Sequence, residues 1–272
     1  MSRLRIDDLH ASVAGHEILR DASLKIAPGS HVAIVGSSGA GKSTLVGLLL
    51  GWHHPSIGTI KVDDRPLDGA LLERLRAATA WVDPAVQLWN RSLIENLLYG
   101  SDPDATAHVR DLAAAAELHG VLERLPDGMM TLLGEGGALV SGGEGQRVRL
   151  GRSLARKTAR LVILDEPFRG LDRRSRALLL ERARDWWRTA TLLCVTHDIG
   201  ETLAFARVLV VEGGQVVEDG APATLLADES SRYRALYDAE EAVRRALWSD
   251  ETWRSLWLEN GRLADRLGGE GT

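Results

Sequence analysis

The feature that most constrains the fold of this chain is a glycine-rich loop between two apolar segments. Residues 36–44 read Gly-Ser-Ser-Gly-Ala-Gly-Lys-Ser-Thr, which matches the phosphate-binding pattern G-x-x-x-x-G-K-[ST]. The apolar run 31–35 precedes the loop and the apolar run 45–50 follows it. This order predicts a strand, a phosphate-binding loop and a helix, and with them a nucleotide site in an α/β core.

Each residue type in the loop has a chemical role. Glycines let backbone N–H groups approach phosphates closely, and the next helix points the positive end of its dipole at them. Lys42 can reach the β- and γ-phosphates of ATP, and the Ser43 hydroxyl can bind Mg²⁺. The predicted ATP-binding residues of the loop are Gly36, Ser37, Ser38, Gly39, Ala40, Gly41, Lys42, Ser43 and Thr44.

Length and composition describe an ordinary globular protein. The 272 residues fit one large or two smaller domains. A net charge of −5 gives no reason to expect nucleic-acid binding. The single cysteine, Cys194, lies in an apolar run and is predicted to be a buried small hydrophobe, which fits a reducing compartment.

No membrane-crossing segment is expected in the sequence. The first residues lack the apolar core of a signal peptide, and no window of 18 apolar residues occurs. If the protein works at a membrane, a partner has to supply the spanning helices.

Apolar patterns along the chain predict alternating strands and helices around an inserted helical region. Residues from about 84 to 157, with helical spacing over 105–125, form the predicted insertion. A hairpin is expected where Gly213 and Gly214 join two short apolar runs. The predicted strands are 4–9, 18–26, 31–35, 57–62, 161–164, 191–196, 208–211 and 215–217, and the main later helix is 173–188.

Further polar motifs follow in order after the loop. Ser141, Gly142, Gly143 and Glu144 open a second glycine-rich turn, which could present N–H groups to phosphate or simply cap a helix. Asp165 ends a buried strand and can hold Mg²⁺, and the adjacent Glu166 can orient or deprotonate the attacking water. Asp172 comes next, and then His197, which alone would be read as structural.

Taken together, these motifs closely resemble the nucleotide-binding domain of an ATP-binding cassette (ABC) transporter, over about residues 3–237. The matches are Walker A (36–44), the signature motif (141–144), Walker B with its catalytic glutamate (161–166), the D-loop (171–172) and the switch histidine (197). Segments 92–97 and 133–137 resemble the exporter type.

The resemblance implies a fold, a mechanism and partners. The fold is an α/β P-loop NTPase core with a mixed, mainly parallel sheet, an N-terminal antiparallel β subdomain and an inserted α-helical subdomain. Two cassettes, identical or different, pack head to tail, with each ATP between the loop of one and the signature turn of the other. ATP and Mg²⁺ then drive closure, hydrolysis and reopening. A membrane-spanning permease would hold the protein on the cytoplasmic face of the cell membrane.

Two positions depart from the family pattern. Pro84 stands where the family has a glutamine, so either Asp83 or Gln87 substitutes or the contact is missing; we favour a missing or altered contact. Val13 occupies the position of an aromatic residue that stacks on adenine. His10 or His16 could stack instead, but Val13 as a plain apolar contact is the favoured interpretation. Since Lys42, Asp165, Glu166 and His197 are retained, hydrolysis is still expected.

Residues 238–272 extend beyond the cassette (1–237) and are predicted to be a helical tail. Apolar residues up to Trp253 and Trp257 fall at helical spacing, with charges between them. The tail could pack on its own domain, dock a partner chain or lie on a membrane surface. For the whole chain, two alternatives stay open: a regulatory or weakly hydrolysing cassette in a heterodimer, and a soluble cassette protein that does not transport.

Overall fold

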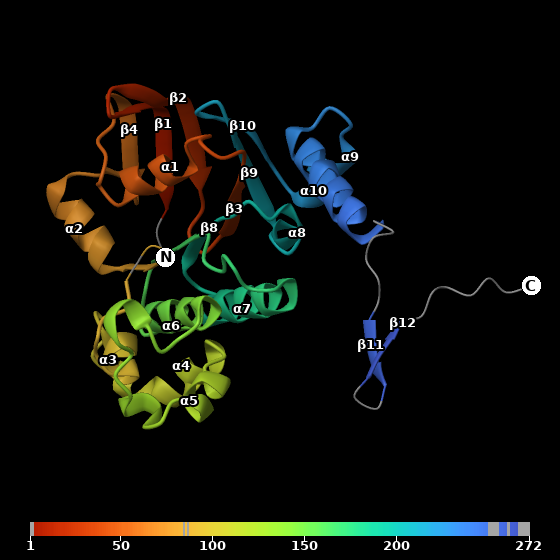
Figure 1. Ribbon diagram of the computed structural model, residues 1–272. Coiled ribbons are helices and arrows are strands. Elements are labelled where there is room, and N and C mark those ends of the chain that lie inside the picture. The colour runs from red at the N-terminus through yellow and green to blue at the C-terminus, as the bar shows by residue number, and fades with distance from the viewer. Residues whose placement is uncertain (1–2, 84, 86, 250–255, 260–261, 266–272) are drawn as a thin grey trace, which may run out of the picture.

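The structure is a computed structural model that describes residues 3–83, 85, 87–249, 256–259 and 262–265. A six-stranded sheet in the order β10-β9-β3-β8-β7-β6 forms the centre of the molecule (Figure 1). All neighbouring pairs in this sheet run parallel except β9 and β10. The strands are β3 (His31–Val35), β6 (Thr79–Val82), β7 (Leu161–Asp165), β8 (Thr191–Val195), β9 (Arg207–Glu212) and β10 (Gln215–Gly220).

The central strand β3 shows why its sequence is continuously apolar. Val32 and Ile34 belong to one hydrophobic cluster, whereas Ala33 and Val35 belong to another on the opposite face. Both faces of the sheet are therefore covered, as expected for parallel strands. Cys194 on β8 is fully buried in the second cluster, and burial raises the pKa of its thiol. This position confirms the interpretation of Cys194 as a small core residue.

A separate antiparallel sheet packs beside the central one, in the order β2-β1-β4-β5. Its strands are β1 (Leu4–Val13), β2 (His16–Ile26), β4 (Ile57–Val62) and β5 (Arg65–Pro66). The turn between β1 and β2 consists of Ala14 and Gly15, both with positive φ, which is the two-residue hairpin geometry that matches strand twist. Because this turn is so short, β1 and β2 extend further than the predicted strands, and Val13 pairs directly with His16.

Helices surround the sheets in two groups. Figure 1 shows α3 to α6 gathered at the end of the molecule away from the antiparallel sheet. This group is the predicted helical insertion, although η1, α4 and α5 divide the single helical run expected over 105–125. Its members are α3 (Leu93–Leu98), η1 (Ala105–His108), α4 (Val109–Ala115), α5 (His119–Arg124), η2 (Gly128–Met130), η3 (Glu135–Gly137) and α6 (Gly142–Leu154).

The remaining helices pack on the core. They are α1 (Lys42–Leu49), α2 (Gly69–Ala77), α7 (Arg173–Trp186), α8 (Ile199–Thr202), α9 (Pro222–Ala227) and α10 (Arg232–Ser249). Among the described residues, no helix is long and apolar enough to cross a membrane.

The predicted helical tail (238–272) is helical up to Ser249 and contains strands further along. The helix α10 ends at Ser249, and β11 (Leu256–Glu259) pairs antiparallel with β12 (Arg262–Asp265). The expected helix is therefore wrong at Trp257, because helical spacing of apolar residues over a short stretch does not distinguish a helix from a hairpin. Trp253 lies outside the described residues, as does Pro84.

Candidate functional site

A cavity of about 400 Å³ lies at the edge of the central sheet, where the phosphate-binding loop leaves β3. The β1–β2 hairpin contributes one wall, the loop and the start of α1 form the floor, and Glu166 closes the side at the end of β7. The lining residues are Val13, His16, Ile18, Ser38, Gly39, Gly41, Lys42, Ser43, Thr44 and Glu166. The structure thus brings together residues that the sequence predicted from three separate motifs.

The loop has room for glycine only at two of its positions. Gly36 and Gly41 have φ of 147° and 107°. A Cβ on Gly36 would lie 2.0 Å from the carbonyl oxygen of Val211 on β9, and one on Gly41 would lie 2.7 Å from Leu19 Cδ2. Neighbouring backbone and core residues therefore pack closely against the loop at both positions, where only glycine fits.

Lys42 folds back over this loop at the first position of α1. Its Nζ donates hydrogen bonds to the carbonyl oxygens of Gly36, at 2.7 Å, and Ser37, at 2.8 Å. Burial lowers the pKa of Lys42, while Glu166 and Asp165 raise it. The ammonium group is thus placed beside the loop, among carboxylates, where a phosphate would lie.

Asp165 lies at the carboxyl end of β7 with a side chain that favours a cation. Burial raises its pKa to about 6, and Asp83 and Glu166 add to this rise, whereas Lys42 and a hydrogen bond with Ser43 oppose it. The influence of Asp83 follows from strand register, because Val82 and Leu164 pair in β6 and β7. Carboxylate and hydroxyl oxygens are ligands that Mg²⁺ prefers, so Ser43 and Asp165 fit this ion.

Glu166 and His197 face each other across the ends of β7 and β8. Glu166 Oε1 lies 3.5 Å from His197 Nδ1. The backbone of Glu166 has a φ of 43°, an uncommon conformation for a residue with a side chain. Its N–H donates to the carbonyl of Val195 at 2.9 Å, so a neighbouring strand holds the residue in that strained conformation.

The second glycine-rich turn and Asp172 are not part of this cavity. Ser141 caps α6 in a reciprocal arrangement with Glu144, whose side chain also pairs with Arg124 on α5. Asp172 caps α7 and accepts from Ser175 N at 3.0 Å. The helix-cap interpretation of the second glycine-rich turn is therefore right within one chain, and Asp172 is a helix cap as well. A Cβ on Gly142 would meet nothing within 4 Å, so the start of α6 presents open space.

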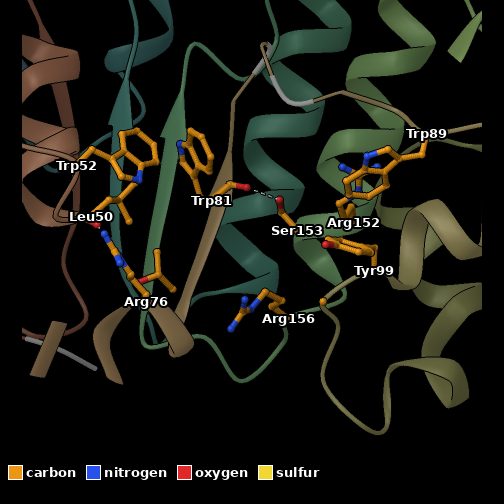
Figure 2. Close-up of a pocket in the computed structure, with 11 residues that line it drawn as sticks. Leu50, Trp52, Arg76, Trp81, Trp89, Tyr99, Arg152, Ser153 and Arg156 are labelled. Carbon is orange, nitrogen blue, oxygen red and sulfur yellow. Dashed lines mark hydrogen bonds between the residues drawn. The ribbon is translucent and has the colours of Figure 1, made fainter. Parts of the chain in front are cut away.

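A second cavity, which the sequence analysis did not find, lies between the core and the helical group. Its volume is about 460 Å³. Figure 2 shows Trp81 beside Trp52 on one side of it, and Trp89 close to Tyr99 on the other. The rings of Trp52 and Trp81 are 4.7 Å apart at a steep angle, and those of Trp89 and Tyr99 are 4.2 Å apart. We call this cavity the aromatic groove. Eight tryptophans in 272 residues were the one available signal for it.

Among the residues that the structure describes, three arginines and no acidic residue line the aromatic groove. Arg152 lies 4.3 Å from the centroid of the Trp89 ring and donates to Asn96 O at 2.8 Å. Arg76 and Arg156 come from α2 and from the segment after α6 (Figure 2). The groove therefore combines exposed aromatic surface with an uncompensated positive charge.

The two segments that resemble the exporter type, 92–97 and 133–137, lie next to each other. Ser92 forms an isolated antiparallel bridge with Leu132. Leu93 N donates to Thr131 O and Leu133 N donates to Arg91 O, both at 3.0 Å. Two stretches separated by 35 residues thus form one backbone unit.

The sequence matches the ABC transporter family over residues 19–169, more than half of the chain. This chain is an ABC transporter family member. The match contains the phosphate-binding loop, the signature turn and the Asp165–Glu166 pair, and the ABC fold agrees with the mixed sheet, separate antiparallel sheet and helices seen here.

Two relatives of this ABC protein are flippases by name. An "ATP-dependent lipid A-core flippase" of Alkalilimnicola ehrlichii is 38% identical over 81% of this chain, which spans 37% of that protein. A second flippase, of Thiobacillus denitrificans, is 36% identical over 86% of the chain and 41% of its own length. The chain thus spans about two fifths of these relatives.

A solved structure gives the same result. The "structure of a bacterial Atm1-family ABC exporter with ATP bound" superposes with a TM-score of 0.82 at 32% identity, over 88% of this chain and 42% of that one. The prediction of an exporter-type nucleotide-binding domain is thereby confirmed.

Proposed function

We propose that this chain hydrolyses ATP and that the reaction powers transport through a membrane-spanning partner, in the manner of an exporter. The observation that carries the proposal is one cavity in which Lys42 and Ser43 stand opposite Glu166, with His197 in contact with that carboxylate. A steady-state assay of phosphate release by the purified chain, with and without Mg²⁺, tests it. Absence of Mg²⁺-dependent turnover in the presence of its partner would refute it.

Each residue has a proposed role. The loop N–H groups and Lys42 bind the phosphates, and Ser43 and Asp165 hold Mg²⁺, which when bound neutralises phosphate charge. Glu166 orients or deprotonates the water, and His197 holds Glu166. A second cassette supplies Ser141, Gly142, Gly143, Glu144 and Asp172 across a head-to-tail interface. Pro84 stands where the family has a glutamine, and this departure leaves a regulatory cassette as the second candidate function. ATP hydrolysis by a homodimer of the wild-type chain would exclude that candidate.

The base of the nucleotide is predicted to be held weakly. Val13 and His16 form the wall of the cavity nearest the hairpin turn, and a valine cannot stack as a ring does. Val13→Tyr is expected to tighten ATP binding by about 0.5–1.5 kcal/mol, the contribution of one aromatic pair. GTP should compete measurably with ATP in the wild type. Titration calorimetry measures the affinities for ATP and GTP. If the wild type binds GTP far more weakly than ATP and Val13→Tyr does not tighten ATP binding, another residue contacts the base.

The aromatic groove is the proposed docking site for the permease. Arg76, which is exposed, and Arg156, which is half-buried, call for an acidic side chain on the docking segment. Trp52 and Tyr99, which are 50% and 59% exposed, call for apolar residues beside it. A short amphipathic helix with one carboxylate meets both demands. The chain would then be a peripheral protein on the cytoplasmic face of the membrane.

Trp89→Ala is expected to weaken this docking and leave ATP binding intact. The Trp89 ring packs on Tyr99 and Arg152 inside the groove, whereas the phosphate-binding loop lies on another part of the core. Co-fractionation of variant and wild type with membranes that contain the permease measures the effect, and Trp186→Ala, outside the groove, is the control. A wild type that stays soluble with every candidate permease and captures nucleic acid or ribosomes would instead support a soluble, non-transport protein.

A further inference from the structure

The C-terminal helix α10 contacts the short helix α8 that follows His197. Tyr233 and Glu240 lie seven residues apart on α10, about two helical turns, and so share one face. The Tyr233 hydroxyl, which is fully buried, lies 2.7 Å from Thr202 Oγ1 at the end of α8. This contact anchors one end of α8 to α10.

Glu240 anchors the other end of α8. The first N–H groups of a helix have no acceptor within the helix. Asp198 caps α8 and accepts from Glu201 N at 3.2 Å. Ile199 N, at 2.5 Å, and Gly200 N, at 3.3 Å, donate to the two carboxylate oxygens of Glu240. A side chain 41 residues further along thus fixes the backbone just after His197.

The carboxylate of Glu240 is held in this position against an electrostatic cost. Burial raises its pKa, and Asp198 raises it further, while the Ile199 and Gly200 amides lower it. Arg176 on α7 lies 2.5 Å from Asp198 and 3.2 Å from Glu201 and balances part of the negative charge. The hydrogen bonds from Ile199 N and Gly200 N therefore offset part of the cost of burying Glu240 beside Asp198.

His197 is therefore held from both sides. Thr196 N, before it, donates to the Ile34 carbonyl at 3.2 Å in the central sheet. Ile199, two residues after it, is held by Glu240. Between these anchors, His197 Nδ1 lies 3.5 Å from Glu166 Oε1. A shift of α8 would move the histidine relative to Glu166, and displacements of about 1 Å can cost 10²-fold in rate.

We propose that Glu240 is a positioning residue for His197, through which α10 controls ATP turnover. Glu240 does not line the nucleotide cavity, so it acts through the α8 backbone and not on the nucleotide. The effect on turnover rests on the proposed ATP hydrolysis; the contact itself does not.

Steady-state hydrolysis by Glu240 variants tests the effect on turnover. Glu240→Ala is expected to lower kcat by about 10- to 100-fold and to leave KM for ATP within about twofold, because the phosphate-binding loop is untouched. Glu240→Gln should keep most of the activity, since its amide oxygen can still accept from Ile199 N. Glu229→Ala is the matched control, as that carboxylate is 91% exposed. A raised KM for ATP with an unchanged kcat in Glu240→Ala would overturn the proposal.

A double-mutant cycle separates positioning from general damage. In a His197→Ala background, Glu240→Ala should lower kcat no further, because the residue it positions is gone. If the two substitutions lower kcat independently, so that their fold-losses multiply, the proposal is overturned.

Amide hydrogen exchange over residues 196–202 gives a readout without ATP. Exchange should be faster in Glu240→Ala than in wild type or Glu229→Ala. Unchanged protection would overturn the proposal whatever the hydrolysis result. An inactive wild type with the expected exchange pattern would instead count against ATP hydrolysis and leave the α10 contact supported.

Discussion

Glu166→Gln is expected to lower ATP turnover by about 10²–10⁴-fold, the usual contribution of a general base. Glutamine keeps the size of the side chain but cannot take a proton from water. ATP binding should persist, because Lys42 and Ser43 are unchanged, and a closed dimer should accumulate in the presence of ATP. Phosphate release measures the turnover, and light scattering on a sizing column measures the dimer.

The matched control for this prediction is Glu73→Gln, on the exposed face of α2. It makes the same change of charge away from the cavity and should leave turnover unchanged. If Glu166→Gln turns over ATP at the wild-type rate, Glu166 does not act on the water. If Glu166→Gln fails to bind ATP, its low turnover results from lost binding, and the assignment of Glu166 as the base fails as well.

Arg152→Ala is expected to lower the free energy of unfolding by about 3–5 kcal/mol, because buried hydrogen bonds from a charged group are strong and their loss leaves acceptors unpaired. Arg152 is 8% exposed. It donates to Asn96 O at 2.8 Å, to Asn96 Oδ1 at 2.9 Å and to Gln87 O at 3.1 Å. Burial lowers its pKa to about 10, so the group stays charged at neutral pH. Urea unfolding measures the change.

Arg91→Ala is the control for Arg152. Its guanidinium is 63% exposed and lies 3.9 Å from Glu95, a surface pair worth less than about 1 kcal/mol. A loss of stability as small for Arg152→Ala as for Arg91→Ala would show that the hydrogen bonds to Asn96 and Gln87 do not hold the helical group in place.

Elements with a strong apolar pattern could be predicted from the sequence almost to the residue. The strands β3 and β4 have the predicted ends, and β7 and β8 differ by one residue, because a buried strand between turn residues leaves little ambiguity. Extents set by tertiary contacts could not be predicted. The β1–β2 hairpin is longer because its two-residue turn needs positive φ at Ala14, and the tail contains a hairpin where a helix was expected.

The nucleotide site could be predicted because its residues occur in short motifs along the sequence. Gly36 to Thr44 follow β3, Asp165 ends β7 and Glu166 comes directly after it. Parallel strands bring their carboxyl ends to one edge of the sheet. The aromatic groove and the Glu240 contact have no such signal. Trp52 meets Trp81, and Glu240 meets Ile199, only after folding, and no spacing rule along the chain relates them. Asp83 lies next to Asp165 in strand register, but the family position Pro84 stays outside the described residues, so what replaces its glutamine stays a prediction.

The order of strands in the central sheet has a consequence for how the protein is made. Chains leave the ribosome from the N-terminus, so β3 emerges before β8 and β9. The two sheet neighbours of β3 are β8 and β9. The carbonyl group that packs against Gly36 belongs to Val211 on β9. The phosphate-binding loop therefore cannot take its final form until about 170 more residues, up to Val211, have been synthesised. Until β8 and β9 have been made, the phosphate-binding loop is incomplete and β3 lacks both of its sheet neighbours, which leaves an apolar strand open to aggregation.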